Sequence, residues 1–395
     1  MNYKEYFPYF QNTNITYLDN GATTQKPQCV IDAELEYYTH YCANTHRSNF
    51  GNANKATTNY EDARKYLQKF INAKDSSEII FTKGVTESIN FIASSFAKEF
   101  KTIIISSLEH HSNIVPWHMQ DRTIGDGLEV VGYKDNFAFD FEEFESILQK
   151  NPNSFVSITH ISNAFGTMND IKRICQLTHK YDSYVLIDGA QSLGHKKIDM
   201  QDIDCDFFAI SGHKTFAATG VGAIYIKQEL LKSVKPYQTG GATIKSVSYE
   251  KSVLLDSPHK FEAGTQNIAG IIGFKKALEF IDGIGYEEIE EKENKLYEYL
   301  HNELNNIEDI VFYNTTEDSI SNKSFNIKGI VHDDLGMLLD KQKVAIRVGH
   351  HCAMPMMEKL QIKGTIRVSL AFYNDFEDID KFIVAFKKSI KMLKD

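Results

Sequence analysis

The chain has 395 residues, of which 42% are hydrophobic and 24% charged, and its 43 Lys and Arg against 53 Asp and Glu give a formal net charge of −10. This balance is typical of globular proteins and excludes a largely disordered or fibrous chain. The acidic net charge argues against a general nucleic-acid binder, which carries a basic stripe, and no stretch approaches the ~18 apolar residues of a membrane span.

Seven short apolar runs between residues 78 and 227 predict buried β-strands, because they are rich in β-branched and aromatic residues and are bounded by turn residues or charges. Several are joined by helical patterns such as ESINFIASSFAKEF and DIKRICQLTHKY. This alternation is typical of a mostly parallel sheet with helices on both faces. We therefore expect one large α/β domain with a seven-stranded, mostly parallel sheet. The runs are EIIFT (78–82), TIIISSL (102–108), LEVVGY (128–133), FVSITHIS (155–162), YVLIDGA (184–190), FFAISG (207–212) and GVGAIYIK (220–227).

The pattern changes near residue 253. A long charged helical pattern covers 285–307, and shorter strand candidates follow in SFNIKG, VAIRVGHH and TIRVSL. These features predict a smaller α+β domain, so we assign 16–252 to the large domain and 1–15 with 253–395 to the small one. No flexible linker separates them, and we expect a packed interface with a cleft, where such sheets bind ligands.

Cysteine usage indicates a reducing compartment. The five cysteines, Cys29, Cys42, Cys175, Cys205 and Cys352, are odd in number, are scattered over a long chain and form no C-x-x-C pair. The first ten residues, MNYKEYFPYF, contain no apolar core of a signal peptide. We therefore expect a cytoplasmic protein in which four cysteines fill the core; the fifth lies in the segment RVGHHCAMP.

Polar residues follow several of the predicted strands. Gly84 allows a tight turn before a helix, and the amides near Val85 and Thr86 could face an anion at its N-terminus, although plain capping is the simpler interpretation. The strand YVLIDGA ends in Asp188, with Gln191 three residues on; a carboxylate there is costly unless it meets a cation. Taken alone, capping and function explain this aspartate equally well.

Lys214 follows another apolar strand, with Ser211 and His213 just before it. Partial desolvation of such a lysine lowers its pKa and frees the amine for Schiff-base chemistry. A lone lysine at this place more often extends its amine to water.

Two pairs of adjacent histidines suggest a metal at first sight, in EHHSN (His110 and His111) and in RVGHHC (His350 and His351). Neighbours on an extended chain point to opposite faces, so both cannot easily bind one ion. We expect no metal site.

Together these elements are more specific than any one of them. A carboxylate, a lysine 26 residues later, a phosphate-type turn and an upstream histidine match the needs of pyridoxal phosphate. That cofactor requires an amine for its aldehyde, an acid for its pyridinium nitrogen and donors for its phosphate.

Seven motifs extend this match to a family: CANTHR, EHHSNIVPW, IDGAQS, SGHK, FEAGT, RVGHHCAMP and IRVSLAFYN. With them the sequence resembles the SufS-like (group II) cysteine desulfurases, within the class V aminotransferase group of fold-type I pyridoxal-phosphate enzymes. The resemblance runs from near residue 17 to near residue 375. It implies the fold type I architecture, a large domain and a smaller one.

The resemblance also implies the roles of the cofactor residues. Lys214 matches the Schiff-base lysine, Asp188 the acid at the pyridinium nitrogen and Gln191 the donor to the ring hydroxyl. His110 matches the histidine stacked on the ring. The phosphate contacts correspond to Thr86, Ser211 and His213, together with Thr265, which the other subunit of a homodimer supplies.

For the substrate, the resemblance implies that Asn163 and Arg367 hold the carboxylate of L-cysteine and that Cys352 accepts its sulfur. Arg347, which lies five residues before this cysteine in the same segment, is also expected to bind the substrate. With His350 and His351 it could lower the pKa of the thiol, since the thiolate is the nucleophile.

The implied activity converts L-cysteine to L-alanine with the sulfur held as a persulfide on Cys352. A small acceptor protein then receives the sulfur, for iron–sulfur cluster or other sulfur assembly. Pro355 restrains the short segment that carries the cysteine, so we expect slow release without the acceptor. Two alternatives stay open: selenocysteine lyase activity with the same machinery, and a pyridoxal-phosphate-binding protein without turnover, which the intact lysine, aspartate and cysteine disfavour.

The chain departs from the family pattern at four places. Gly21 stands where alanine is usual, and residues 48–50 differ from the usual sequence after CANTHR. The segment GGATI (240–244), with Ala242 and Thr243, stands where GGxMI is usual, and Gln266 stands where proline is common. These places lie in loops near the substrate mouth and the dimer contact. We expect them to affect substrate preference and partner docking, and to leave the cofactor chemistry intact.

Overall fold

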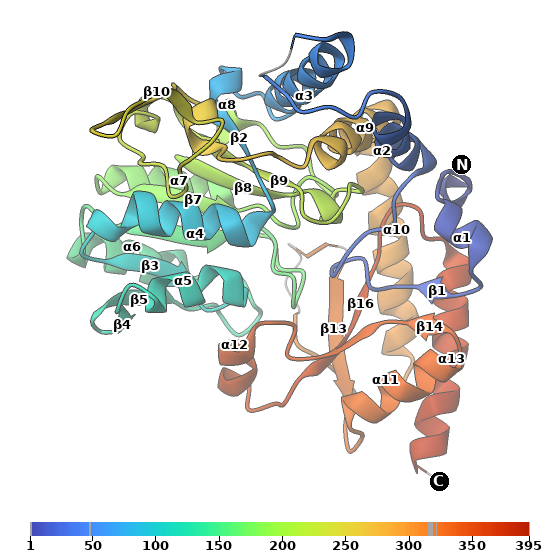
Figure 1. Ribbon diagram of the computed structural model, residues 1–395. Helices are drawn as coiled ribbons and strands as arrows, with labels where there is room; N and C mark the ends of the chain where they lie inside the picture. The colour runs from blue at the N-terminus through green and yellow to red at the C-terminus, as the bar shows by residue number, and fades with distance from the viewer. Residues whose placement is uncertain (1, 47–48, 315–318, 321, 395) are drawn as a thin grey trace.

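The computed structural model describes residues 2–46, 49–314, 319–320 and 322–394 (Figure 1). Its largest element is an eight-stranded sheet in the order β2-β9-β8-β7-β6-β3-β5-β4. Neighbouring strands are parallel, except that β9 runs antiparallel to β2 and β8. The strands are β2 (Ile79–Thr82), β3 (Ile103–Ser106), β4 (Thr123–Ile124), β5 (Gly127–Val131), β6 (Phe155–Thr159), β7 (Tyr184–Asp188), β8 (Phe207–Ser211) and β9 (Gly222–Ile226).

The mostly parallel sheet was predicted, and a strand overlaps each of the seven predicted runs. The predicted count of seven is wrong by one strand, because β4 also joins the sheet. This strand has two residues, both exposed. So short an exposed strand produces neither an apolar run nor an alternating pattern, and these were the two signals available.

The central strands are mainly apolar because the sheet faces a hydrophobic core on both sides. In β6, Val156 and Ile158 pack in one hydrophobic cluster with helix α7 (Ile171–Lys180), whereas Phe155 packs in a second cluster with helix α4 (Val85–Ser95). The expectation of helices on both faces is thus confirmed. The remaining helices of this part are α2 (Gln28–His40), α3 (Gly51–Phe70), α5 (Val115–His118), α6 (Phe141–Lys150) and α8 (Met200–Ile203).

A second, antiparallel sheet lies beside the first, at the lower right of Figure 1, in the order β12-β13-β16-β15. Its own hydrophobic core includes residues of α10, α11 and α13. The strands are β12 (Ile310–Phe312), β13 (Asn322–Ile327), β15 (Arg347–Gly349) and β16 (Thr365–Ser369). The helices are α10 (Tyr286–Asn305), α11 (His332–Lys341), α12 (Met354–Lys359) and α13 (Phe376–Lys394).

The predicted charged helix over 285–307 is present as α10. The run VAIRVGHH, expected as one strand, forms two: β14 (Val344–Ala345) pairs in parallel with β1 (Thr16–Tyr17), and only β15 joins the four-stranded sheet.

The remaining elements belong to neither of these two sheets. Helix α9 (Ile268–Ile284) packs in the core of the large sheet, together with residues of α2 and α3. The strands β10 (Ile244–Val247) and β11 (Ser252–Leu254) form a separate hairpin, and α1 (Pro8–Asn12) follows a short 3-10 helix at Tyr3–Tyr6. The division into 16–252 and the remainder stays a prediction.

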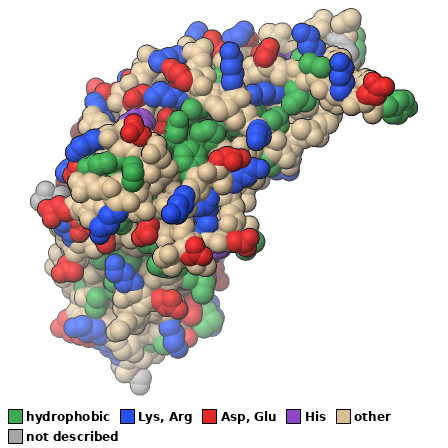
Figure 2. Space-filling model, turned by 90° about the vertical axis from the view of Figure 1, so that its left-hand side faces the viewer, with side chains coloured by type: hydrophobic (Ala, Val, Ile, Leu, Met, Phe, Trp, Pro, Cys, Tyr) green, Lys and Arg blue, Asp and Glu red, His purple; other side chains and the backbone are tan. Residues whose placement is uncertain are grey.

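On the face shown in Figure 2, hydrophobic side chains gather in a band between acidic and basic ones. Among the described residues, no helix is both long and apolar enough to cross a membrane.

Candidate active site

A cavity of about 610 Å³ brings the predicted site residues together. Three neighbouring parallel strands deliver residues to it from their last positions: Thr159 from β6, Asp188 from β7 and Ser211 from β8. The second sheet adds Arg347 and Arg367. Every predicted site residue except Thr265 lines this cavity. The others are Val85, Thr86, His110, Asn163, Asp188, Gln191, Ser211, His213, Lys214, Arg347, Cys352 and Arg367.

Lys214 and Asp188 face this cavity from adjacent strand ends. Burial lowers the pKa of Lys214 to about 8; the charge of Asp188 opposes this shift, and Arg367 adds to it. Burial raises the pKa of Asp188, while its hydrogen bond from the Ala190 amide (2.9 Å, to Oδ1) and the charge of Lys214 lower it. The site therefore holds an amine that is partly uncharged near neutral pH beside a buried carboxylate.

A candidate anion-binding turn at Gly84, Val85 and Thr86 lines part of the cavity. Helix α4 begins after Gly84, which has φ +142°, and no side chain caps its first amides. A Cβ on Gly222 of β9 would lie only 2.6 Å from the Gly84 Cα, so this close approach requires glycine there. The free amides near Val85 and Thr86 suit a phosphate group, because helix N-termini favour negative charge.

His110 is an uncharged ring at neutral pH. Burial, with the charge of Lys214, lowers its pKa to about 3. Its Nδ1 accepts a hydrogen bond from the backbone amide of Ser112 (3.0 Å), so the proton of the neutral ring is on Nε2. A neutral, fixed ring suits stacking on a flat ligand.

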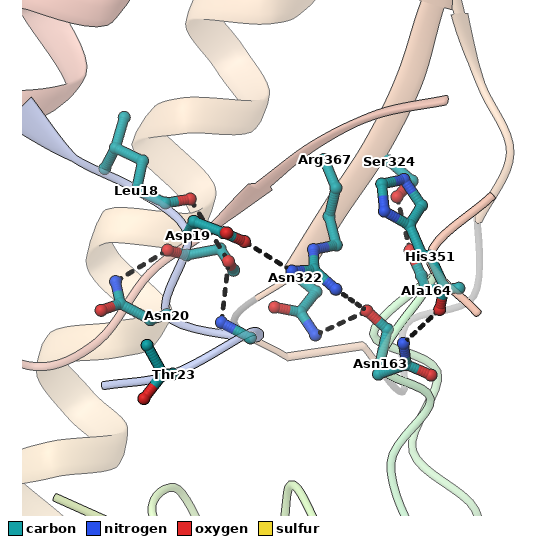
Figure 3. Close-up of polar contacts among 12 residues, drawn as sticks. Leu18, Asp19, Asn20, Thr23, Asn163, Ala164, Asn322, Ser324, His351 and Arg367 are labelled. Carbon is teal, nitrogen blue, oxygen red and sulfur yellow. Dashed lines mark hydrogen bonds and ion pairs between the residues drawn. The ribbon is translucent and has the colours of Figure 1, made fainter. Parts of the chain in front are cut away.

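Arg367 is a buried cation held from two sides (Figure 3). Its Nη2 contacts Oδ1 of Asp19 at 2.6 Å, and its Nη1 donates to the carbonyl of Asn163 at 2.8 Å. Its Nε is buried and has no hydrogen-bond partner among the described residues. The sequence did not reveal Asp19, which lies near the start of the resemblance, in YLDNGATTQKP (17–27). Its partner is 348 residues away, and no local signal links them.

Gln191 and Asn163 are already bonded within the chain. The Gln191 side-chain amide donates to the Gly21 carbonyl (2.8 Å), and the Gly21 amide donates to Ser369 Oγ (2.9 Å). The Asn163 side-chain amide donates to the carbonyl of His351 (2.7 Å), next to Cys352. Asn163 thus contacts Arg367 through its backbone and the cysteine segment through its side chain.

The segment around Cys352 is fixed by two further histidines. His351 and Cys352 have φ of +50° and +57°, a region that non-glycine residues seldom adopt. The His111 amide donates to the carbonyl of Cys352 (2.8 Å), and its Nε2 accepts from the Met354 amide (3.2 Å). His350 Nδ1 accepts from the Cys352 amide (3.0 Å). These bonds hold the strained backbone on both sides of the cysteine.

His351 is uncharged at neutral pH, because burial, with the charges of Arg367 and Arg347, lowers its pKa to about 2. Its Nε2 lies 2.9 Å from Thr365 Oγ1. His351 therefore adds no positive charge beside Cys352, contrary to one of the expected contributions.

Thr265 lines a separate cavity of about 440 Å³, together with Gly241 and the two departures Ala242 and Gln266. The structure thus does not bring it to the main cavity of the same chain. Of the departures at 48–50, residue 48 lies outside the described residues, and Phe50 is an exposed residue before α3.

His46 and His259 line the same second cavity. Together with the neighbouring Glu61 they have possible metal-ligand atoms within 4.8 Å of one another, a group found among the described residues. However, both Glu61 oxygens contact the Arg64 guanidinium, at 2.9 and 3.3 Å. A cation there would compete with a buried positive charge, so we assign no metal to it.

Residues 16–382 match the family model for Aminotransferase class-V. The chain belongs to this family. A cysteine desulfurase of Wigglesworthia glossinidia brevipalpis is 41% identical over 389 residues, which are 97% of this chain and 94% of that protein. The family depends on pyridoxal phosphate, so the prediction of an enzyme of this kind is confirmed.

Solved structures agree over nearly the whole length. The apo structure of a cysteine desulfurase from Thermococcus onnurineus NA1 matches with a TM-score of 0.93 and 33% identity, covering 98% of this chain and 97% of that one. The cysteine desulfurase CsdA from Escherichia coli matches with a TM-score of 0.91 and 32% identity, covering 99% and 98%. The predicted fold class is confirmed; assignment to the SufS-like group stays a prediction.

Proposed function

We propose that this protein is a cysteine desulfurase that converts L-cysteine to L-alanine and keeps the sulfur as a persulfide on Cys352. The observation that carries this proposal is one cavity lined by Lys214, Asp188 and Cys352, with two arginines beside them. The relatives named above support it over nearly the full length of the chain.

The lining of the cavity fits pyridoxal phosphate. Asp188 uses Oδ1 for the Ala190 amide, and Oδ2, which has no hydrogen bond among the described residues, can accept from the pyridinium nitrogen. Lys214 offers an amine for the aldehyde, His110 a flat neutral ring, and the first turn of α4 donors for the phosphate. When bound, this cofactor supplies an aldehyde that captures amines and a ring that withdraws electrons from the substrate.

The chain's own residues then act on the substrate. Arg367, with Arg347 nearby, binds the carboxylate of L-cysteine, for which a guanidinium is well shaped. Lys214 Nζ removes the α-proton, since its lowered pKa makes it an effective base near neutral pH. His110 and the cavity wall keep the reacting groups in one orientation.

Cys352 accepts the sulfur. Its thiolate forms a sulfur–sulfur bond to the substrate while the substrate's Cβ–sulfur bond breaks, and the electron pair of that bond stays with the carbon skeleton. Protonation of the skeleton gives L-alanine. The sulfur remains on Cys352 until another thiol removes it.

Three further proposals follow for partners and location. A small acceptor protein presents its own thiol at the cavity, because the bonded segment around Cys352 keeps the persulfide in place. A second copy of the chain supplies Thr265, which lies in a separate cavity of its own chain. The five free cysteines suit the reducing cytoplasm.

An assay of the purified protein loaded with pyridoxal phosphate tests the proposal. L-Cysteine should yield L-alanine and, after a pulse without reductant, a Cys352 peptide heavier by one sulfur atom. A yellow protein that forms no L-alanine would instead be a cofactor-binding protein without turnover. Formation of L-alanine from selenocysteine but not from cysteine would favour a selenocysteine lyase.

A further inference from the structure

Asp19 forms an ion pair with Arg367, the arginine proposed to bind the substrate's carboxylate. None of the sequence motifs assigns a role to Asp19. Arg367 is 1% exposed and Asp19 21% exposed. A guanidinium buried this deeply needs a counter-charge, because an isolated buried charge is strongly unfavourable. Asp19 provides it, and no other ion pair of Arg367 exists among the described residues.

Asp19 contacts Arg367 from outside the cavity. Arg367 and Gly21 line the cavity, whereas Asp19 does not. Figure 3 shows Asp19 and Asn163 on opposite sides of the guanidinium, with Nη2 bonded to one and Nη1 to the other. Two of the three guanidinium nitrogens are therefore fixed by the chain, and the plane of the group is set before a substrate arrives.

Gly21, one of the departures from the family pattern, lies in the same loop as Asp19 and close to Arg367. A Cβ on residue 21 would lie 3.2 Å from Cζ of Arg367 and 2.9 Å from Oδ1 of Asn322. The loop therefore packs directly on the guanidinium. Through the Gly21 carbonyl the same loop also binds Gln191 on the cofactor side.

We propose that Asp19 is a positioning residue for the substrate's carboxylate, acting through Arg367: it neutralises and orients the guanidinium so that a carboxylate entering the cavity meets a fixed donor pair. This inference rests on the proposed role of Arg367. It predicts that Asp19 affects ligands that carry a carboxylate and leaves unchanged those that lack one.

Cysteamine, which is L-cysteine without its carboxylate, provides the decisive comparison. In the cofactor-loaded protein, the visible absorption change reports the binding of either amine, without any need for turnover. Asp19→Asn keeps an oxygen that can accept the hydrogen bond but removes the charge, and should weaken L-cysteine binding about tenfold, as expected for a charge-assisted bond reduced to a neutral one. Asp19→Ala should weaken it further, on the order of 100-fold, and cysteamine binding should change with neither variant.

Asp309→Asn is the matched control, since Asp309 also forms a 2.7 Å ion pair, with Lys394, away from the cavity. It should change neither ligand's binding. Equal weakening of L-cysteine and cysteamine by the Asp19 variants would mean a general structural effect and would overturn the proposal. Tighter L-cysteine binding would also overturn it, because Asp19 would then compete with the substrate. The absence of L-alanine formation in the wild type would refute the proposed function, yet this titration would still test Asp19.

Discussion

The lowered pKa of Lys214 makes a quantitative prediction about the apoprotein. With a pKa of about 8, roughly 20% of Lys214 side chains are uncharged at pH 7.4, whereas an ordinary lysine with a pKa of 10.5 is uncharged in about 0.1% of molecules. The difference is on the order of 200-fold in reactive amine. A small amine-directed reagent should therefore label Lys214 with a midpoint near pH 8, when labelling is followed by peptide mass spectrometry.

Two other lysines serve as internal controls. Burial also lowers the pKa of Lys26 and of Lys323 to about 8. Neither lines the cavity, and their amines donate to the His213 carbonyl (3.2 Å) and to the Tyr297 hydroxyl (3.2 Å), respectively. Pyridoxal phosphate with borohydride should therefore attach to Lys214 alone, because the cavity and its anion-binding turn select the site. Attachment to Lys26 or Lys323, or a labelling midpoint of Lys214 above pH 10, would refute the reasoning.

Three further predictions concern the same residues. Lys214→Met should stabilise the apoprotein by about 3 kcal/mol below pH 8, and this gain should disappear by about pH 10.5. The reason is that the folded wild type holds the lysine proton less tightly than the unfolded chain, so the stability of the wild type rises with pH between these two values. Denaturant titrations of both proteins at several pH values measure the difference. Arg367→Ala should weaken L-cysteine binding by about 2–5 kcal/mol and leave the bound cofactor's absorption unchanged; unaltered L-cysteine affinity would contradict the carboxylate role. Cys352→Ser should bind L-cysteine normally but form no protein persulfide, and sulfur found on Cys42 or Cys205 by mass spectrometry would show that another thiol is the acceptor.

The large sheet could be predicted because its strands give local signals, and the combination of a strand-end carboxylate with a later lysine indicated the cofactor, whereas the roles of the other cofactor residues came from the resemblance to the family. Asp188 ends one apolar strand and Lys214 lies three residues after the neighbouring one, and adjacent parallel strands end at the same edge of a sheet. Their proximity therefore follows from the strand order alone. The exposed two-residue strand β4 gave no such signal.

The contacts between distant segments could not be read from the sequence. Asp19 pairs with an arginine near the other end of the chain, and the Asn163 side chain binds the His351 carbonyl rather than projecting free for a substrate. Both bonds depend on how the second sheet is set against the first. No periodicity within a single segment encodes that placement.

This placement also divides the chemistry between the two sheets. The large sheet holds Lys214, Asp188 and the anion-binding turn at its strand ends. In the second sheet, β15 carries Arg347 and leads into the Cys352 segment, and the neighbouring β16 carries Arg367. Asn163, which follows β6 of the large sheet, bonds to both Arg367 and the carbonyl before Cys352. A shift of one sheet against the other would therefore move the carboxylate donor and the sulfur acceptor together. The pairing of β15 with β16 links the two groups within this part of the chain, and the bonds of Asn163 and His111 tie them to the part that carries Lys214.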